Sequence, residues 1–379
     1  MRQRTGRTAN GFSISSSRRP YDGSPRTPPV AKPQRGLYDA AERTDRRPMA
    51  VPSLKKGFSF SIKGAVTLGL IWFVLRDQDL HVVGERLSAM SAWSVLVALA
   101  LLAGQNVLAA QRWVIVMRQF GDAVPYKLAL RFYFEGLFFN QALPSTVGGD
   151  GVRMFRVVKS GIPVGAGVNG VLLDRIAGLF ALLAIVALTQ PWLYERVESF
   201  SARTAFAIVI AAGFSGVLLL MLCSRLPGTW TGWGIVRGLV GLSSGLASLL
   251  RHGGAVPVLA LSFAGHLMMV LAIFVLARDL GLGVSYMDCL VLVPGVMLLA
   301  AAPISIAGWG VRESVMISAM ALVGAPEAGA LGLSLVYGLI MLVIGLFGGA
   351  LWLANPDRKV SEIEALQTAE KTAGGKPAR

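Results

Sequence analysis

The sequence predicts an all-α protein, a polytopic membrane helix bundle with about six full spans and two re-entrant broken helices in an inverted repeat. Three observations lead to this fold class. Only 15% of the residues are charged and 54% are hydrophobic, whereas a soluble domain carries about 25% charged residues. After residue 57, apolar runs that approach or exceed the roughly 20 residues of a membrane span alternate with short basic segments. Two shorter apolar runs end in similar Pro/Gly-rich segments.

The apolar runs define the order of the predicted elements. Six of them are predicted as spans, over residues 58–75, 93–110, 167–188, 204–223, 256–277 and 328–353. Two others, 132–143 and 287–302, are too short to cross a bilayer, and each leads into a proline. We expect both to enter the membrane and return to the same side. Residues 225–252 are predicted as a long, mildly amphipathic connection.

The basic residues predict the orientation, because loops rich in Lys and Arg stay in the cytoplasm. The richer segments precede residue 58, occupy 112–131, 153–159 and 225–251, and follow the last span. The chain is therefore predicted to be a multi-pass protein of the inner (plasma) membrane with both termini cytoplasmic.

Residues 1–56 differ in composition from the rest of the chain. They hold 13 Lys/Arg against 4 Asp/Glu, mixed with Pro, Ser and Gly, and such a composition cannot bury a core. We expect a disordered basic cytoplasmic tail there, a transmembrane domain over 57–354 and a cytoplasmic tail over 355–379. Met1 and Met49 both fit as the translation start. Because this tail holds much of the basic excess, the net charge of +15 does not indicate nucleic-acid binding.

The two short apolar runs belong to an internal repeat. LPSTVGGDGVR, residues 143–153, aligns with APISIAGWGVR, residues 302–312, and RQFGDAVPY at 118–126 aligns with RDLGLGVSY at 278–286. The repeat units are about 93–190 and 256–353. The predicted orientation places their broken segments on opposite faces, as in transporters built from inverted repeats.

Charged residues beside these breaks are candidates for a binding site, because charge at membrane depth is costly and usually functional. Asp174 is predicted to pair with Arg153, and Arg175 with Asp150. Two interpretations fit the arginines that close the motifs: they bind an anionic lipid head group, or they lie at the interface and anchor the topology. The candidate head-group residues are Arg153, Arg312, Asp150, Asp174, Arg175, Glu313, Asn140 and Gln141.

The remaining polar residues of the breaks have two possible roles. Asn140 and Gln141 line a cavity or satisfy the broken backbone, and Glu135 is open to the same two roles. The predicted hinge residues are Pro144, Gly148, Gly149, Gly151, Pro303, Gly308 and Gly310.

Other site chemistry finds little support. Of three histidines only His266 falls within a span, and a core histidine is favoured there over a metal ligand. Cys223 and Cys289 are the only cysteines, so neither a disulfide framework nor a cysteine metal site is expected. GGDG at 148–151 departs from the GxGD pattern of intramembrane aspartyl proteases at Val147, and no GxSxG, P-loop or HExxH is present. No cofactor, metal or catalytic residue is predicted.

Three ordered motifs, NQALPSTVGGDGVRMFRVVKSG, LLDRIAGL and PISIAGWGVRES, resemble the lysylphosphatidylglycerol synthase transmembrane-region family, also called flippase-like-domain or YbhN-like proteins. The resemblance covers about residues 58–353. It implies a domain that moves aminoacylated lipid to the outer leaflet in the synthases. Only about 25 residues follow the last span, so we expect the soluble synthase activity to be absent.

The prediction from the sequence is a lipid transporter or flippase that moves or presents an anionic, amino- or glyco-lipid by alternating access, and not an enzyme. The alternative is a non-transporting partner that presents lipid to an envelope glycosyltransferase or other lipid-modifying enzyme. An intramembrane lipid-modifying enzyme ranks lower, because no nucleophile–base pair is recognisable. The expected partners are a membrane lipid and such an envelope enzyme.

Overall fold

The structure, a computed structural model, describes residues 80–354 except 122–123, 143–147, 226–233 and 302–307, together with five positions between 67 and 76. The predicted tails, most of the first predicted span, and the hinge candidates Pro144 and Pro303 lie outside the described residues. Every regular element of the described part is helical, which confirms the all-α class.

Five helices in the described part are long and apolar enough to cross a membrane, and they correspond to five of the six predicted spans. They are α4 (Ala92–Met117), α7 (Val164–Leu188), α9 (Phe200–Leu222), α11 (Ala255–Asp279) and α14 (Glu327–Leu353).

The predicted end of the second span was wrong. Helix α4 continues past Ala110 to Met117, because Arg112 finds buried partners on neighbouring helices. The basic segment that was predicted as a cytoplasmic loop therefore begins inside the bundle.

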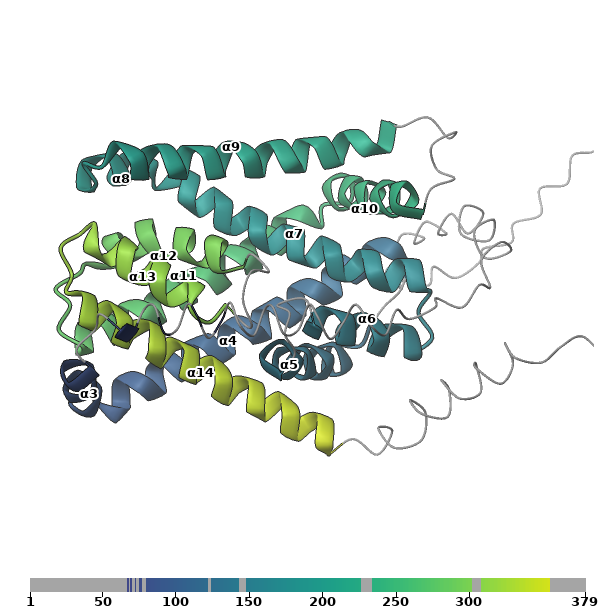
Figure 1. The fold of residues 1–379 in the computed structure, drawn as a ribbon. Coiled ribbons are helices and arrows are strands. Elements are labelled where there is room, and N and C mark those ends of the chain that lie inside the picture. Colours follow the sequence, from purple (N-terminus) through teal and green to yellow (C-terminus); the bar gives the residue numbers. More distant parts are fainter. Residues whose placement is uncertain are drawn as a thin grey trace, which may run out of the picture. The chain divides into compact units, whose positions relative to one another are not determined.

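Four shorter helices form the two breaks. Helices α5 (Tyr126–Ala142) and α12 (Tyr286–Ala300) are about 26 and 22 Å long at 1.5 Å per residue, less than the roughly 30 Å of a bilayer core. Helix α6 (Gly148–Lys159) follows the first and α13 (Val311–Ala321) the second. Figure 1 shows α5 and α6 near one end of the bundle, and α12 and α13 near the other.

The helices repeat in order and in their endings. A long helix, a short apolar helix, a short helix and a second long helix appear as α4–α7 and again as α11–α14. Helices α6 and α13 both end at a glycine in the left-handed region, Gly161 at φ 95° and Gly324 at φ 76°. The next amide reaches back five residues, from Ile162 to Val157 O and from Ala325 to Met320 O. This is a Schellman cap, so the two glycines form the same backbone turn at the same place in each group of four helices.

Packing joins the two groups of four helices. Helices α4 and α11 lie against each other, α5 packs on α14, and α12 packs on α7. The α5–α14 contact depends on glycine: a Cβ at Gly348 would overlap the Phe134 carbonyl, and Gly349 faces the Phe138 ring. Small residues let membrane helices approach this closely. Each short apolar helix is thus held by the last helix of the other group.

Four α-helices of the described part lie outside this repeat: the long helix α9, α3 (Leu80–Ser88), α8 (Gln190–Arg196) and α10 (Gly234–Arg251). The last of them corrects the predicted connection 225–252, most of which is helical. Three of its four buried residues, Leu242, Gly245 and Leu249, recur at spacings of three and four, the period of one helix face.

Candidate functional site: a buried arginine–carboxylate cluster

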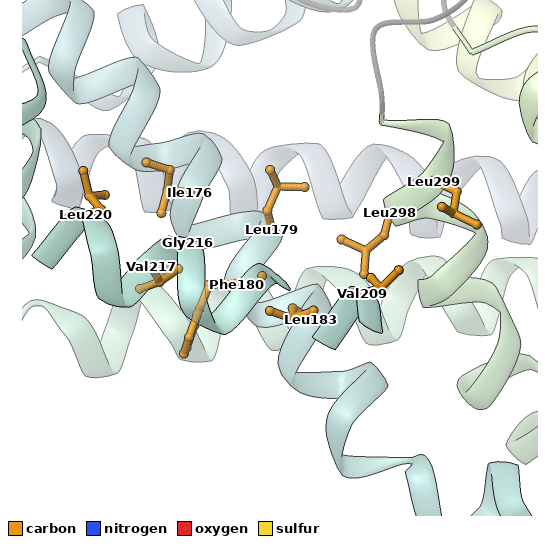
Figure 2. Close-up of a pocket in the computed structure, with 11 residues that line it drawn as sticks. Ile176, Leu179, Phe180, Leu183, Val209, Gly216, Val217, Leu220, Leu298 and Leu299 are labelled. Atoms are coloured by element: carbon orange, nitrogen blue, oxygen red, sulfur yellow. The ribbon is translucent and has the colours of Figure 1, made fainter. Parts of the chain in front are cut away.

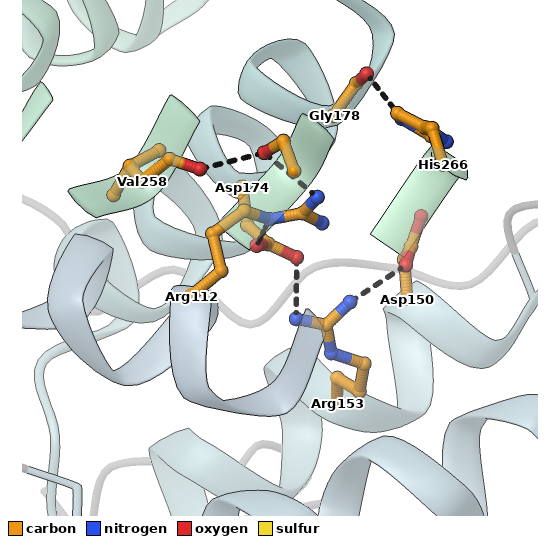
Figure 3. A network of polar contacts seen from close by, with 8 residues as sticks. Arg112, Asp150, Arg153, Asp174, Gly178, Val258 and His266 are labelled. Atoms are coloured by element: carbon orange, nitrogen blue, oxygen red, sulfur yellow. Dashed lines mark hydrogen bonds and ion pairs between the residues drawn. The ribbon is translucent and has the colours of Figure 1, made fainter. Parts of the chain in front are cut away.

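Asp174 is the centre of a buried ionic network (Figure 3). The side chain lies on α7 and is 1% exposed. Its Oδ1 accepts a hydrogen bond from Arg112 Nε at 2.8 Å, and its Oδ2 accepts one from Arg153 Nη2 at 3.0 Å. The predicted Asp174–Arg153 pair is confirmed. Arg112 is a second partner that the sequence reasoning missed.

Asp150, on the first turn of α6, joins the same network. One carboxylate oxygen lies 2.5 Å from Arg175 Nε, and the other lies 3.5 Å from Arg153 Nη1. The predicted Arg175–Asp150 pair is therefore confirmed. Because adjacent helical residues point about 100° apart, Asp174 and Arg175 reach different partners from neighbouring positions.

Arg112 extends the network to α11. Its Nη1 donates to Ser262 Oγ at 3.2 Å, and that hydroxyl donates to Val258 O at 2.7 Å. Nearby, Nε2 of His266 lies 2.9 Å from the Gly178 carbonyl oxygen, which fits the predicted core histidine (Figure 3). The described residues contain no group of three His, Cys, Asp or Glu side chains placed to hold a metal ion.

Arg153 is enclosed by aromatic rings as well as by carboxylates. Its guanidinium carbon lies 4.2 Å from the Trp113 ring centroid and 4.5 Å from that of Tyr133. Only 5% of the residue is exposed, and the same is true of Arg312. Both side chains are therefore enclosed by the protein itself, and the interpretation as topology anchors at the interface stays a prediction.

A second set of ionic contacts joins α5 to α6. The fully buried Glu135 accepts from Arg131 Nε at 3.0 Å and from Arg156 Nε at 2.9 Å. Glu135 therefore holds two arginines together, a role that differs from the two predicted for it. Arg131 stands four residues before Glu135 on α5, a spacing at which helical side chains meet.

The first turn of α6 is held by the end of α5. Oδ1 of Asn140 accepts the Gly149 amide at 2.8 Å, which satisfies one of the amides left unpaired at a helix start. Asn140 thus caps the broken backbone, the second of its two predicted roles. A Cβ at Gly149 would overlap the Gly136 carbonyl, so the two helices touch through glycine. Gln141 is half-buried, with its stem next to Gly345 of α14.

The second break has a smaller polar site. Arg312 donates from Nη2 to Glu313 and from Nε to Ser334 Oγ at 3.1 Å. Glu313 also accepts the Gly310 amide at 2.6 Å. The arginine lies over the rings of Trp309 and Tyr337, at 4.8 and 5.4 Å from their centroids.

The predicted hinge glycines fall into two groups. Gly308 and Gly310 adopt φ of 78° and 84°, which favours glycine because other residues rarely enter this region. Gly148, Gly149 and Gly151 instead lie in the first turn of α6.

The two halves differ in charge although their helices correspond. The repeat alignment places Trp309 opposite Asp150, and the helix starts place Tyr337 opposite Asp174. The first half therefore uses carboxylates where the second uses aromatic rings. Both support an arginine, because a ring face attracts a guanidinium.

Five apolar helices of spanning length around buried ion pairs define a polytopic membrane protein. The chain belongs to the family described as the lysylphosphatidylglycerol synthase TM region, which matches residues 60–349. This family is a membrane domain linked to flippase-like function. A comparison with curated proteins gives no significant match.

Proposed function

We propose that this protein binds the anionic head group of a membrane lipid in the charge cluster of α4–α7 and moves that lipid across the inner membrane by alternating access. The family supports a flippase-like function, and the charge cluster supports a ligand with a negative charge. The proposed orientation has both termini in the cytoplasm.

Arginines outnumber carboxylates in the contacts of this cluster, and this carries the proposal. Within the described residues, five arginines contact three buried carboxylates: Arg112, Arg153 and Arg156 are buried, Arg131 and Arg175 are partly exposed, and the carboxylates are Glu135, Asp150 and Asp174. A cluster rich in guanidinium groups favours an anionic ligand.

Two guanidinium nitrogens that lack a hydrogen-bond partner also indicate an anionic ligand. Arg153 Nε and Arg156 Nη2 are buried and have no hydrogen-bond partner among the described residues. Phosphate oxygens accept charge-assisted hydrogen bonds from guanidinium N–H donors. A lipid phosphate is therefore the ligand chemistry that fits both the charge and the orphan donors.

The arrangement of the breaks supports alternation. The charged break α5–α6 and the weaker polar break α12–α13 lie toward opposite ends of the bundle (Figure 1). In inverted-repeat transporters, rocking of such halves exposes one central site to each side in turn. Each short helix packs on the last helix of the other group, so movement of one group displaces the other.

The proposal involves no covalent chemistry. Asp150, Asp174 and Glu135 each lie within ion-pair distance of two arginines. Carboxylates held in this way are poorly suited to act as a general base, which needs an oxygen free to take a proton.

Purified protein in vesicles tests the proposal. The vesicles contain fluorescent phosphatidylglycerol or fluorescent phosphatidylcholine, and dithionite bleaches the outer leaflet. Arg156→Lys keeps a cation beside Glu135 but removes the unpartnered nitrogen Nη2 of Arg156. One charged hydrogen bond contributes roughly 1.5–3 kcal/mol, so we expect phosphatidylglycerol movement to slow about tenfold or more.

Arg203→Lys is the matched control, because Arg203 lies on α9, donates to the Val197 and Tyr194 carbonyls and lies over the Tyr194 ring, outside the charge cluster. It should leave movement unchanged. Equal rates for Arg156→Lys and Arg203→Lys would reject the head-group site. Binding of phosphatidylglycerol without movement would favour the alternative of a protein that presents lipid to an envelope enzyme.

A further inference from the structure

An apolar groove runs along the side of the bundle between α7, α9 and α12 (Figure 2). Its volume is about 310 Å³, room for about ten groups of the size of a water molecule at roughly 30 Å³ each, and a methylene group is of similar size. All eleven lining residues are apolar, among them Leu179, Leu183 and Leu298.

The protein itself leaves this groove open. None of the α9 residues is buried, so this helix is covered by its neighbours less than any other long helix of the described part. At Gly216, in the groove wall, no atom lies within 4 Å of the position that a Cβ would take. An unfilled space of this size forfeits the dispersion contacts of its lining. In a membrane, hydrocarbon is the material that can occupy it.

On α7 the lining of the groove begins at Ile176, one residue after Arg175 of the charge cluster. Arg175, paired with Asp150, has a side chain that is 34% exposed. Leu179 lies four residues further on, so the two side chains share a helix face. Asp174, in contrast, is turned into the interior. Arg175 is therefore the residue at which the polar site and the groove adjoin.

From Ile176 to Leu183 the groove follows α7 for about 10 Å, at 1.5 Å of rise per residue. On the far side it is closed by Leu298 and Leu299, at the end of α12. A molecule that fits both parts has an anionic group at one end and a flexible hydrocarbon chain at the other.

We propose that this groove holds one acyl chain of an anionic phospholipid whose phosphate engages Arg175. The inference rests on the proposed function, because it takes this lipid to be the one that the charge cluster selects. It adds a second recognition element: the chain is guided along α7 while the head group occupies the cluster.

Photocrosslinking of the full-length protein tests the groove. The protein is placed in phosphatidylglycerol nanodiscs that contain a small fraction of phosphatidylglycerol with a diazirine in the middle of one chain. After irradiation, the labelled peptides are identified by mass spectrometry. We expect labels on the groove-facing residues of α7 and α12. Phosphatidylcholine with the same diazirine should label them at least fivefold less.

Gly216→Leu adds a large side chain at a residue that lines the groove, and no atom lies within 4 Å of the new Cβ. Ala211→Leu is the matched control, because Ala211 is exposed and lies about 140° around the helix, away from the groove. Labelling of α7 and α12 should fall at least fivefold in the first variant and stay at the wild-type level in the second.

Two results would overturn the proposal. Equal labelling in both variants would mean that the chain is not in the groove. Equal labelling by the two phospholipids would mean that ordinary surrounding lipid enters it without head-group selection. The vesicle assay separates these outcomes from the proposed function. Lipid movement without groove labelling rejects the groove alone, and selective labelling without movement rejects transport while groove binding stands.

Discussion

Replacing Asp174 by asparagine should destabilise the protein more than any exposed substitution. Asparagine keeps the size of the side chain but removes the negative charge that pairs with Arg112 Nε at 2.8 Å and with Arg153 Nη2 at 3.0 Å. Its amide offers one acceptor oxygen to two guanidinium groups, so at least one charged hydrogen bond, worth roughly 1.5–3 kcal/mol, is lost. Breaking a buried ion pair costs about 3–5 kcal/mol, and we expect the free energy of unfolding to fall within that range.

The assay is unfolding in mixed micelles with increasing denaturing detergent, followed by tryptophan fluorescence. Glu85→Gln is the control, since Glu85 is largely exposed and pairs only with His81 at 3.4 Å; exposed pairs contribute roughly 0–1 kcal/mol. The double variant Arg112→Met/Asp174→Asn should lose less than the sum of its single variants, because it leaves fewer uncompensated charges. A loss for Asp174→Asn no larger than that for Glu85→Gln would refute the reasoning.

Three further predictions follow from packing, geometry and orientation. Gly348→Ala should push α14 off the backbone of α5 and lower the unfolding midpoint in the same assay, whereas Gly165→Ala, which has open space around it, should not; equal midpoints would contradict the close contact. Arg312→Lys keeps the positive charge but loses the planar guanidinium with its paired N–H donors, so lipid movement at matched expression should be only partly retained. Movement at the wild-type rate would exclude a role for the guanidinium geometry. A cysteine at Arg237 should resist a membrane-impermeant label in intact cells while one at Glu195 reacts, and the reverse pattern would invert the proposed orientation.

The helices were largely predictable because hydropathy is a local property. Five predicted spans correspond to described helices. The pairing of Asp174 with Arg153 followed from a local argument as well: adjacent helical residues diverge, so each needs a partner elsewhere. Asn140 was correctly placed beside the break, although only the structure shows that it caps the Gly149 amide.

The sequence analysis missed some members of the cluster for a physical reason. Hydropathy ends a span at the first charged residues, so Arg112 was counted with a basic loop. Its helix continues because Asp174, 62 residues later in the chain, neutralises it, and no local pattern shows such a contact. Glu135 and Arg156 are likewise joined only by the tertiary packing of α5 on α6. The four-residue spacing of Arg131 and Glu135 was the one signal available.

The asymmetry between the halves was also hidden by the repeat. The alignment emphasised the shared prolines, glycines and arginines, and so it predicted equivalent roles for Arg153 and Arg312. The structure shows the first supported by two carboxylates and the second by Glu313 and Ser334. The difference lies in the positions that do not match, where Asp150 is replaced by Trp309.

The most direct test of the account is whether the wild-type protein alone moves an anionic lipid. Vesicles with fluorescent phosphatidylglycerol in both leaflets are prepared with increasing protein and treated with dithionite. The account predicts that the inner-leaflet pool, which is protected in protein-free vesicles, becomes bleached as the fraction of vesicles holding a protein rises. A protected pool that stays constant at every protein content, with folded protein present in the vesicles, would contradict it.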